Sequence, residues 1–204
     1  MAQSKFRERN PAATRTRIAA VALELFQSQG YAETTIDQIA AAAHVGRRTV
    51  FEHFPSKEAI VFDHLVVRRE VALDRLRARP ENEPPLVSLH AVFREMCEQG
   101  YDRGLLAQIR AVIVANAKLA AEQLSLGNQT FEDTVVAILE NRRTDKRTSV
   151  ELHALTQMAF GWFLTAIRIY FKGQQKSLVR CFDDVVNACI QETAAAFSTT
   201  STAP

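Results

Sequence analysis

The chain of 204 residues is poor in the residues that interrupt helices or cross-link a fold, with seven glycines, six prolines and three cysteines. Because glycine and proline are the residues least suited to a helix interior, their scarcity favours helices. Cys97, Cys181 and Cys189 are odd in number and form no CxxC pair, so neither a disulfide framework nor a zinc site is indicated. Eight residues on one helix separate Cys181 and Cys189 by about 12 Å, too far for a disulfide. Burial as small hydrophobic residues and a redox link between two subunits are the alternatives for these cysteines, and burial is favoured.

No run of alternating apolar and polar residues bounded by turn signals indicates a strand. No apolar run approaches the roughly 20 residues of a membrane helix, and the N-terminus lacks the apolar core of a signal peptide. We therefore expect a cytoplasmic protein with no membrane partner. The hydrophobic fraction of 47% is sufficient for a real core.

Motifs of common catalytic sites are also missing. The sequence contains no GxSxG, no HExxH, no glycine-rich phosphate loop and no catalytic cysteine signature. The five histidines have no metal-ligand spacing. We therefore predict no enzyme, no metal and no cofactor, and a helical enzyme is the least favoured function.

The apolar periodicity predicts an all-α fold of about nine helices. In the first of these, Ile18, Val21, Ala22 and Leu25 fall on one face, and Gly30 ends the helix. Thr35 and Gln38 have the spacing of a capping box at the start of the second. The first expected helix begins at residue 11 or 14 and ends at residue 29, and the others cover residues 35–43, 46–53, 56–79, 86–99, 102–114, 117–140, 149–172 and 176–197.

These helices suggest two domains. Residues 1–57 form a basic arm and a three-helix head, and residues 58–197 form a larger helical domain, with helix 56–79 joining the two. Residues 80–85 read as a linker within the second domain, and residues 198–204 form a polar tail expected to be disordered. Positive charge gathers at the N-terminus, since residues 1–17 contain five Lys or Arg and one Glu, a balance of 5 − 1 = +4. Such an arm is either a solvated tail or lies along DNA phosphates or in a minor groove.

The segment from Thr34 to Lys57 reads as a short capped helix, a turn and a second short helix that carries Arg47 and Arg48. This is the pattern of a helix-turn-helix, whose second helix enters the major groove of DNA. Ser56 is the expected N-cap of the helix that follows.

The order of residues around this motif resembles the TetR family of bacterial transcription regulators. The resemblance covers about residues 14–62, and the remainder of the chain matches the family only in length, helicity and helix count. It rests on Gly30-Tyr31, Thr34-Thr35-Ile36, Ile39-Ala40, Val45, Thr49, Phe51, His53-Phe54 and Lys57-Glu58 at the family's relative spacing.

The resemblance implies that Arg47, Arg48 and Thr49 face DNA and that His53 and Lys57 contact phosphates. A cation in the first helical turn opposes the helix dipole, which is consistent with an anion bound beside Lys57, although an ordinary solvated lysine is the alternative. The full predicted DNA-binding set is Thr34, Thr35, Gly46, Arg47, Arg48, Thr49, His53 and Lys57.

Three positions in the motif leave alternatives open. Arg47 and Arg48 suit either guanine O6 and N7 or phosphates. Gly46 stands where the family commonly has a capping serine. Glu52 can accept a hydrogen bond from cytosine or pair with a neighbouring arginine, and the pair is favoured.

For the second domain the resemblance implies a pocket for a small-molecule effector between about residues 86 and 172. We select candidates by composition, while noting that most of them also suit an ordinary core: Phe93, Cys97, Arg110, Ile113, Asn116, Trp162 and Phe163. Arg168 interrupts an apolar run and suits either an acidic ligand or, preferably, a pair with Asp183 or Asp184.

The last two helices have apolar residues on more than one side, so they must be covered on more than one side. This predicts a homodimer or, alternatively, a helix enclosed within its own domain. The expected dimer residues are Phe160, Ile167, Phe171, Phe182, Val186, Cys189 and Ile190. Together these features predict a homodimeric, ligand-responsive repressor that leaves a palindromic operator when an effector binds. A DNA-binding regulator without a small-molecule ligand is the alternative.

Overall fold

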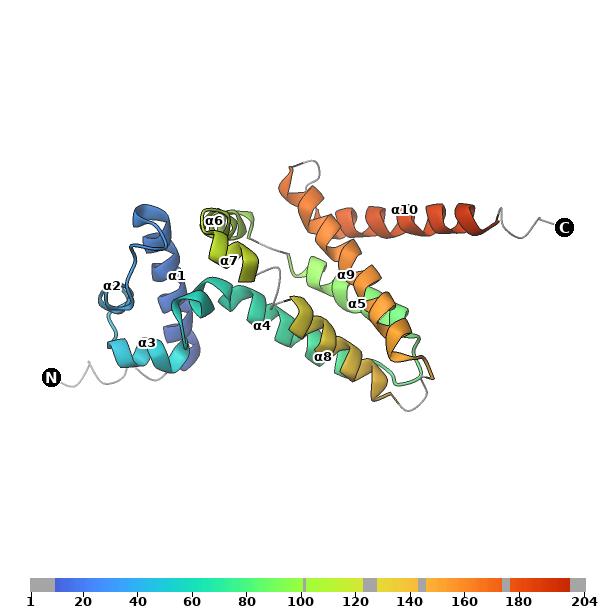
Figure 1. Cartoon of the computed structure of the whole chain (residues 1–204), viewed down its shortest axis with the longest axis horizontal. Helices are drawn as coiled ribbons and strands as arrows, with labels where there is room; N and C mark the ends of the chain where they lie inside the picture. Colours follow the sequence, from blue (N-terminus) through green and yellow to red (C-terminus); the bar gives the residue numbers. More distant parts are fainter. Residues whose placement is uncertain (1–9, 101, 123–127, 143–145, 174–176, 199–204) are drawn as a thin grey trace. The chain divides into compact units, whose positions relative to one another are not determined.

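The computed structural model of the protein describes residues 10–100, 102–122, 128–142, 146–173 and 177–198. Within these ranges all regular secondary structure is helical, which confirms the all-α fold (Figure 1). Residues 1–9 of the predicted basic arm and residues 199–204 of the predicted tail lie outside the described ranges.

The first three helices are α1 (Pro11–Gln29), α2 (Ile36–Ala42) and α3 (Arg47–His53). Gly30 ends α1 in a conformation with φ of +91° that a side chain rarely adopts. The predicted capping box at the start of α2 is confirmed, since the Thr35 hydroxyl accepts from the Gln38 amide and the Gln38 side chain accepts from the Thr35 amide. Gly46 begins α3 without a side-chain cap.

The later helices follow the predicted ranges closely, and Ser56 caps α4 by accepting from the Ala59 amide. The helix expected over residues 117–140 is described as two segments, α7 and α8. The seven helices are α4 (Lys57–Arg77), α5 (Pro85–Glu98), α6 (Arg103–Val114), α7 (Ala117–Glu122), α8 (Asn128–Glu140), α9 (Ser149–Phe171) and α10 (Leu178–Ser198).

The chain divides into two compact units, with α4 running through the division. Unit 1 comprises residues 1–67 and 104–126, and unit 2 comprises residues 68–103 and 127–204. The boundary predicted at residue 57 therefore falls inside unit 1. Helices α6 and α7, expected in the second domain, group with the three-helix head, because their apolar faces are buried in its core.

Unit 1 has a core to which six helices contribute. Its fully buried members include Ile18 of α1, Ile39 of α2 and Val50 of α3. Helices α4, α6 and α7 add Ile60, Val61, Ile109, Val112, Ile113 and Leu119. The first three helices thus share one hydrophobic core with helices that are distant in the sequence.

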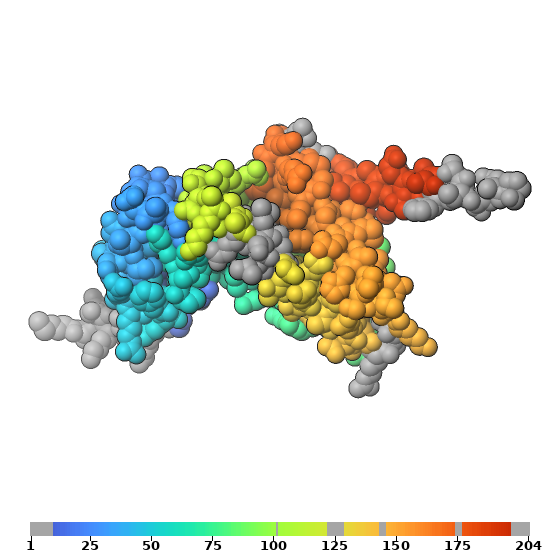
Figure 2. All heavy atoms as spheres, viewed as in Figure 1, coloured from blue at the N-terminus to red at the C-terminus, as the bar shows by residue number. Residues whose placement is uncertain are grey.

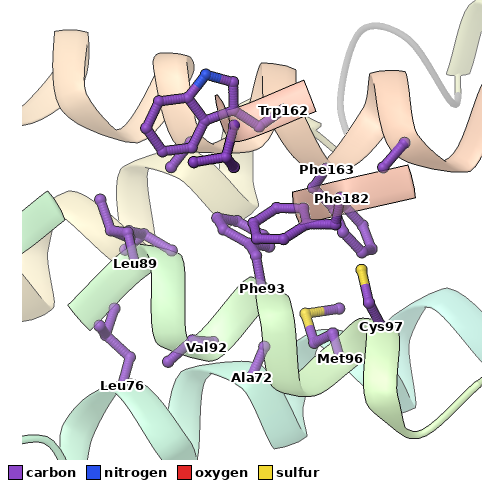
Figure 3. Packing of buried hydrophobic residues seen from close by; sticks show 14 of the residues in the cluster. Ala72, Leu76, Leu89, Val92, Phe93, Met96, Cys97, Trp162, Phe163 and Phe182 are labelled. Carbon is purple, nitrogen blue, oxygen red and sulfur yellow. The ribbon is translucent and has the colours of Figure 1, made fainter. Parts of the chain in front are cut away.

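Unit 2 has a separate core built mainly on α5, α8, α9 and α10. Figure 3 shows Phe93 of α5 beside Phe163 of α9 and Phe182 of α10. The rings of Phe93 and Phe163 stack with centroids 5.2 Å apart, and Phe160 lies 5.9 Å from Phe131. Such aromatic pairs add to the stabilisation from burial.

Candidate nucleic-acid interface

The turn between α1 and α2 is fixed by buried polar contacts. The Thr34 hydroxyl donates to the Gly30 carbonyl over 2.8 Å, and the Gln29 amide donates to the Thr34 hydroxyl. The side chain of Thr34 is only 1% exposed. The structure therefore places Thr34, a predicted DNA contact, in the interior, whereas Thr35 lies at the surface.

One side of α3 faces solvent and the other packs on the head. The exposed residues are Arg47, Arg48, Phe51 and Glu52, whereas Val50 is fully buried. At 100° per residue these four positions occupy a continuous arc of about 140°. We call this arc the exposed face of α3, and it is the part of the helix that can meet a groove of DNA.

Two ion pairs link the charges at this face. Arg47 Nη1 lies 2.8 Å from Asp37 Oδ2, and Arg48 Nε lies 3.0 Å from Glu52 Oε1. The second pair confirms the favoured partner of Glu52. The Arg48 side chain is 93% exposed. Because exposed pairs contribute only about 0–1 kcal/mol, either arginine can exchange its carboxylate for DNA at low cost.

The other predicted contacts on this helix occupy its flank. Thr49 and His53 are half-buried. The His53 backbone carbonyl accepts a hydrogen bond from Arg15. Phe51, in contrast, was absent from the predicted DNA-binding set although it shares the exposed face with Arg47. Its position four residues after Arg47 was the available signal, because residues i and i+4 share a helix face.

Arg15, counted in the predicted basic arm, is engaged within unit 1. Its Nε and Nη2 atoms donate to Asp63 Oδ1 over 2.8 and 2.6 Å, and its guanidinium carbon lies 4.5 Å from the Phe54 ring centroid. Arg17 donates to the Ala43 carbonyl. These two arginines join α1 to α2, α3 and α4 and thereby hold the exposed face in place.

Lys57 likewise binds inside the head. Its ammonium donates to the carbonyls of Tyr31 over 2.6 Å and Thr34 over 2.8 Å, and a longer contact of 3.4 Å reaches Ala32. It also lies 4.2 Å from the Tyr31 ring centroid. An ammonium has three donors. The structure therefore gives Lys57 the role of closing the α1–α2 turn onto α4, and its predicted phosphate contact stays a prediction.

Lys57→Met should lower the free energy of unfolding of unit 1 by about 1–3 kcal/mol, because carbonyls that accept from a charged donor lose it. The salt dependence of DNA binding should stay unchanged, since no phosphate contact is removed. Lys118→Met, at an exposed pair, is the matched control and should cost less than about 1 kcal/mol. Unfolding in urea and DNA titrations over a range of salt concentrations measure both quantities. A reduced salt slope with unchanged stability would restore the phosphate role.

Glu58, next to Lys57, has a strongly lowered pKa. A hydrogen bond from its own backbone N–H lowers the pKa to about 2, with further contributions from the side chains of Lys118, Ser56 and Tyr31. Lys118 Nζ lies 3.2 Å from Glu58 Oε1 and links α7 to the start of α4. The ionised carboxylate thus stabilises the packing of α7 within unit 1.

Because the folded pKa of Glu58 lies below its ordinary value of 4.5, its contribution to stability is complete above that value and disappears as the pH falls towards 2. Glu58→Gln should therefore lower the Tm of unit 1 at pH 7. The difference from the wild type should shrink between pH 4.5 and 2. Thermal unfolding followed by circular dichroism measures it, and a difference that does not depend on pH would contradict the assignment.

The predicted effector residues are divided between the two units. Phe93, Cys97, Trp162 and Phe163 come together in the core of unit 2. Ile113 instead belongs to the core of unit 1. Arg110 is exposed, and the Asn116 side chain caps α7 by accepting from the Leu119 amide.

Burial shifts the pKa values of two thiols in unit 2. Burial raises the pKa of Cys97 to about 12 and also raises that of Cys181. The thiolate, which is the reactive form, is therefore scarce at neutral pH. Cys189, for which burial was favoured, is exposed in the single chain. Arg94, rather than the predicted Arg168, binds Asp183 at 2.9 Å.

The predicted dimer residues also separate into two groups. Phe182 and Val186 are buried in the core of unit 2, and Phe160, Ile167 and Phe171 are half-buried. Cys189 and Ile190 are exposed, Ile190 by 56%.

Other kinds of site find no support in the described ranges. They hold no group of three or more His, Cys, Asp or Glu side chains that could bind a metal ion. None of the helices described is both long and apolar enough to cross a membrane.

The head has the geometry of a helix-turn-helix protein, with α2 and α3 packed on α1 and one side of α3 free. Comparison with known proteins agrees. The family model described as bacterial regulatory proteins of the tetR family matches residues 18–63. The transcriptional regulator TcmR of Streptomyces glaucescens is 35% identical over 125 residues, which cover 58% of this chain and 55% of TcmR. The match therefore spans just over half the length of that relative.

Among solved structures, the TetR-family repressor FadR of Thermus thermophilus, in complex with lauroyl-CoA, is 30% identical over 85% of this chain and 91% of its own, with a TM-score of 0.47. NalD of Pseudomonas aeruginosa, the secondary repressor of the MexAB-OprM multidrug efflux pump, is 22% identical over 89% of this chain and 97% of its own, with a TM-score of 0.54. NalD shows a shared fold. The family match and the sequence identities show that the chain belongs to the TetR family.

Proposed function

We propose that this protein is a DNA-binding transcriptional repressor that acts in the cytoplasm. The exposed face of α3 carries the proposal, because it presents Arg47 and Arg48 on a helix that is bonded to α1 through Arg15 and to α2 through Asp37. A short helix of this kind fits the major groove, where arginine binds guanine O6 and N7. Thr35, Gly46, Thr49 and His53 lie beside this face and are the proposed backbone contacts.

The proposed repressor is a homodimer that joins through α9 and α10. Along α10, Phe182 and Val186 are buried, but the same helical stripe continues through Cys189 into a segment, residues 187–196, in which every residue is exposed. Figure 2 shows this half of α10 projecting beyond the rest of unit 2. The half-buried Phe160, Ile167 and Phe171 on α9 complete the proposed surface. A second copy would cover these apolar side chains and place two heads on a palindromic operator.

The proposed effector binds within unit 2. The core there is rich in aromatic rings around Phe93, Trp162 and Phe163. The hydroxyl of Thr156 on α9 is buried and has no hydrogen-bond partner among the described residues. Buried polar groups normally have partners. A small molecule that bonds this hydroxyl and displaces side chains of this core would bias unit 2 between two arrangements. A difference of about 1–3 kcal/mol in its affinity for the two would change DNA binding 5- to 150-fold.

Titration of labelled DNA from upstream of the protein's own gene and its neighbours tests the DNA-binding proposal. We expect one fragment to bind far more tightly than random DNA at moderate salt, and its sequence to contain an inverted repeat. Absence of specific binding to every fragment would overturn the proposal. Compounds that raise the Tm of the protein and release the bound fragment would identify the effector. If a broad metabolite screen changes neither property, a regulator without a small-molecule ligand becomes the better description.

Sedimentation equilibrium tests the dimer. The wild type should have twice the chain mass of 22.8 kDa. Ile190→Glu places a charge in the proposed interface and should give a monomer. Gln191→Glu introduces a charge of the same sign a half-turn away from Phe182 on the helix and should leave the dimer intact. If the two variants have the same oligomeric state, this surface is not the dimer interface.

A further inference from the structure

Phe51 is the one residue on the exposed face of α3 that has neither a charge nor a polar group. Phe51 is 43% exposed, whereas Val50 before it and Phe54 after it in the sequence are fully buried. The helix therefore has a well-formed inward side, and Phe51 is not part of it. The ring can bind an apolar group, and the arginines beside it can bind negative charges. A partner that fits this surface therefore has an apolar group close to negative charges.

The surroundings of Phe51 restrict that partner. The guanidinium carbon of Arg47 lies 5.6 Å from the Phe51 ring centroid, and Asp37 of α2 holds the same arginine from another side. Arg48 and Glu52 complete the face. The Phe51 ring and the Arg47 guanidinium thus form one continuous surface that is apolar on one side and positively charged on the other. Asp37 holds the arginine in this position.

The major groove of DNA offers one apolar group at the edges of its bases, the C5 methyl of thymine. A protein partner is less suitable, because the exposed part of the ring is small and is bordered by two arginines that favour phosphates. We propose that Phe51 is a specificity-determining residue whose ring contacts the C5 methyl of one thymine in each operator half-site. This inference rests on the proposed function and adds a base preference to it.

The position of that thymine follows from the geometry of the helix. Arg47 and Phe51 are one helical turn apart, about 6 Å along the axis, whereas successive base pairs are about 3.4 Å apart. The thymine read by Phe51 should therefore lie within about two base pairs of the base or phosphate bound by Arg47. A thymine contact at this distance would be repeated symmetrically in the second half-site.

Replacement of individual thymines by uracil in the identified operator tests the proposal, because uracil lacks only the C5 methyl. For the wild-type protein, one symmetric pair of thymines should be sensitive, with affinity about four-fold weaker for each methyl removed and about 15-fold weaker for both. Substitution at the other thymines in the half-site should have little effect. The measurement is a competition titration of the full-length protein at fixed salt.

Phe51→Ala provides the second arm of the experiment. It should bind the thymine operator more weakly than the wild type and bind the thymine and uracil operators equally well, so that the sensitive pair disappears. Phe51→Leu keeps an apolar side chain and should retain part of the sensitivity to uracil. It keeps the proposal testable if the alanine variant fails to fold. Thermal unfolding of each variant confirms that the head is folded.

Two outcomes separate this inference from the proposed function. Tight wild-type binding to an operator in which no thymine is sensitive to uracil would overturn the role of Phe51 and leave the function intact. Equal sensitivity in the wild type and Phe51→Ala would also overturn it, because the methyl would then be read by another residue. A complete lack of specific binding would instead contradict the proposed function.

Discussion

Arg48→Ala is expected to weaken operator binding by at least roughly 30-fold. Each half-site would lose an arginine contact of about 1–3 kcal/mol, and a dimer loses two. The Arg48–Glu52 pair in the free protein offsets little of this, because the arginine is 93% exposed. Removal of the guanidinium should leave the stability of the head almost unchanged. Fluorescence anisotropy with the operator and with random DNA measures the effect.

The comparison of the two DNAs shows what Arg48 reads. A loss confined to the operator indicates a base contact, whereas an equal loss on both DNAs with a smaller salt slope indicates phosphate contacts. Arg77→Ala is the charge-matched control, because Arg77 pairs with Asp74 on an exposed part of α4. Unchanged operator affinity of Arg48→Ala would remove Arg48 from the interface.

Phe54→Ala should lower the free energy of unfolding of unit 1 by about 3–5 kcal/mol, since it leaves a cavity at a fully buried ring. The change also removes the surface on which the Arg15 guanidinium stacks at 4.5 Å. This is a large part of the 5–15 kcal/mol that stabilises a typical domain. DNA binding should be lost at temperatures where unit 1 unfolds.

The location of the only tryptophan allows the two units to be followed separately. Trp162 is buried in the core of unit 2, so its fluorescence reports on that unit, whereas circular dichroism reports on all helices. Phe54→Ala should shift the part of the circular dichroism transition in urea that belongs to unit 1 and leave the fluorescence transition in place. Phe51→Ala is the matched control on the same helix, with an expected cost below about 1 kcal/mol. Equal costs for the two variants would contradict the assigned burial.

The fold class and the helix-turn-helix followed from short-range features of the sequence. The apolar spacing of α1, the Thr35–Gln38 capping box and the Ser56 cap involve residues at most a few positions apart. Side chains at such separations meet whenever the helix forms, so the pattern alone is informative. The family resemblance lay in this same segment, which the family model also matches.

The sequence also indicated the importance of Arg47 and Arg48, but not which neighbours complete the site. Phe51 was left out of the predicted DNA-binding set, and its exposure of 43% distinguishes it from the fully buried Phe54. Both are phenylalanines in the same short segment. Their roles differ because Phe51 lies within α3, whereas Phe54 follows the last residue of the helix in an extended conformation and its ring belongs to the core of unit 1.

By itself, then, the sequence determined an all-helical protein with a DNA-reading motif near its N-terminus, because caps and periodicity act locally. The tertiary structure decided which charges have partners within the head. Arg15 and Lys57 reach acceptors 48 and 23 to 26 residues away in the chain. It also assigned α6 and α7 to the head. The chain contains many carbonyls and carboxylates that could accept from a given cation. Only the packing of the whole unit decides which of them lies near it.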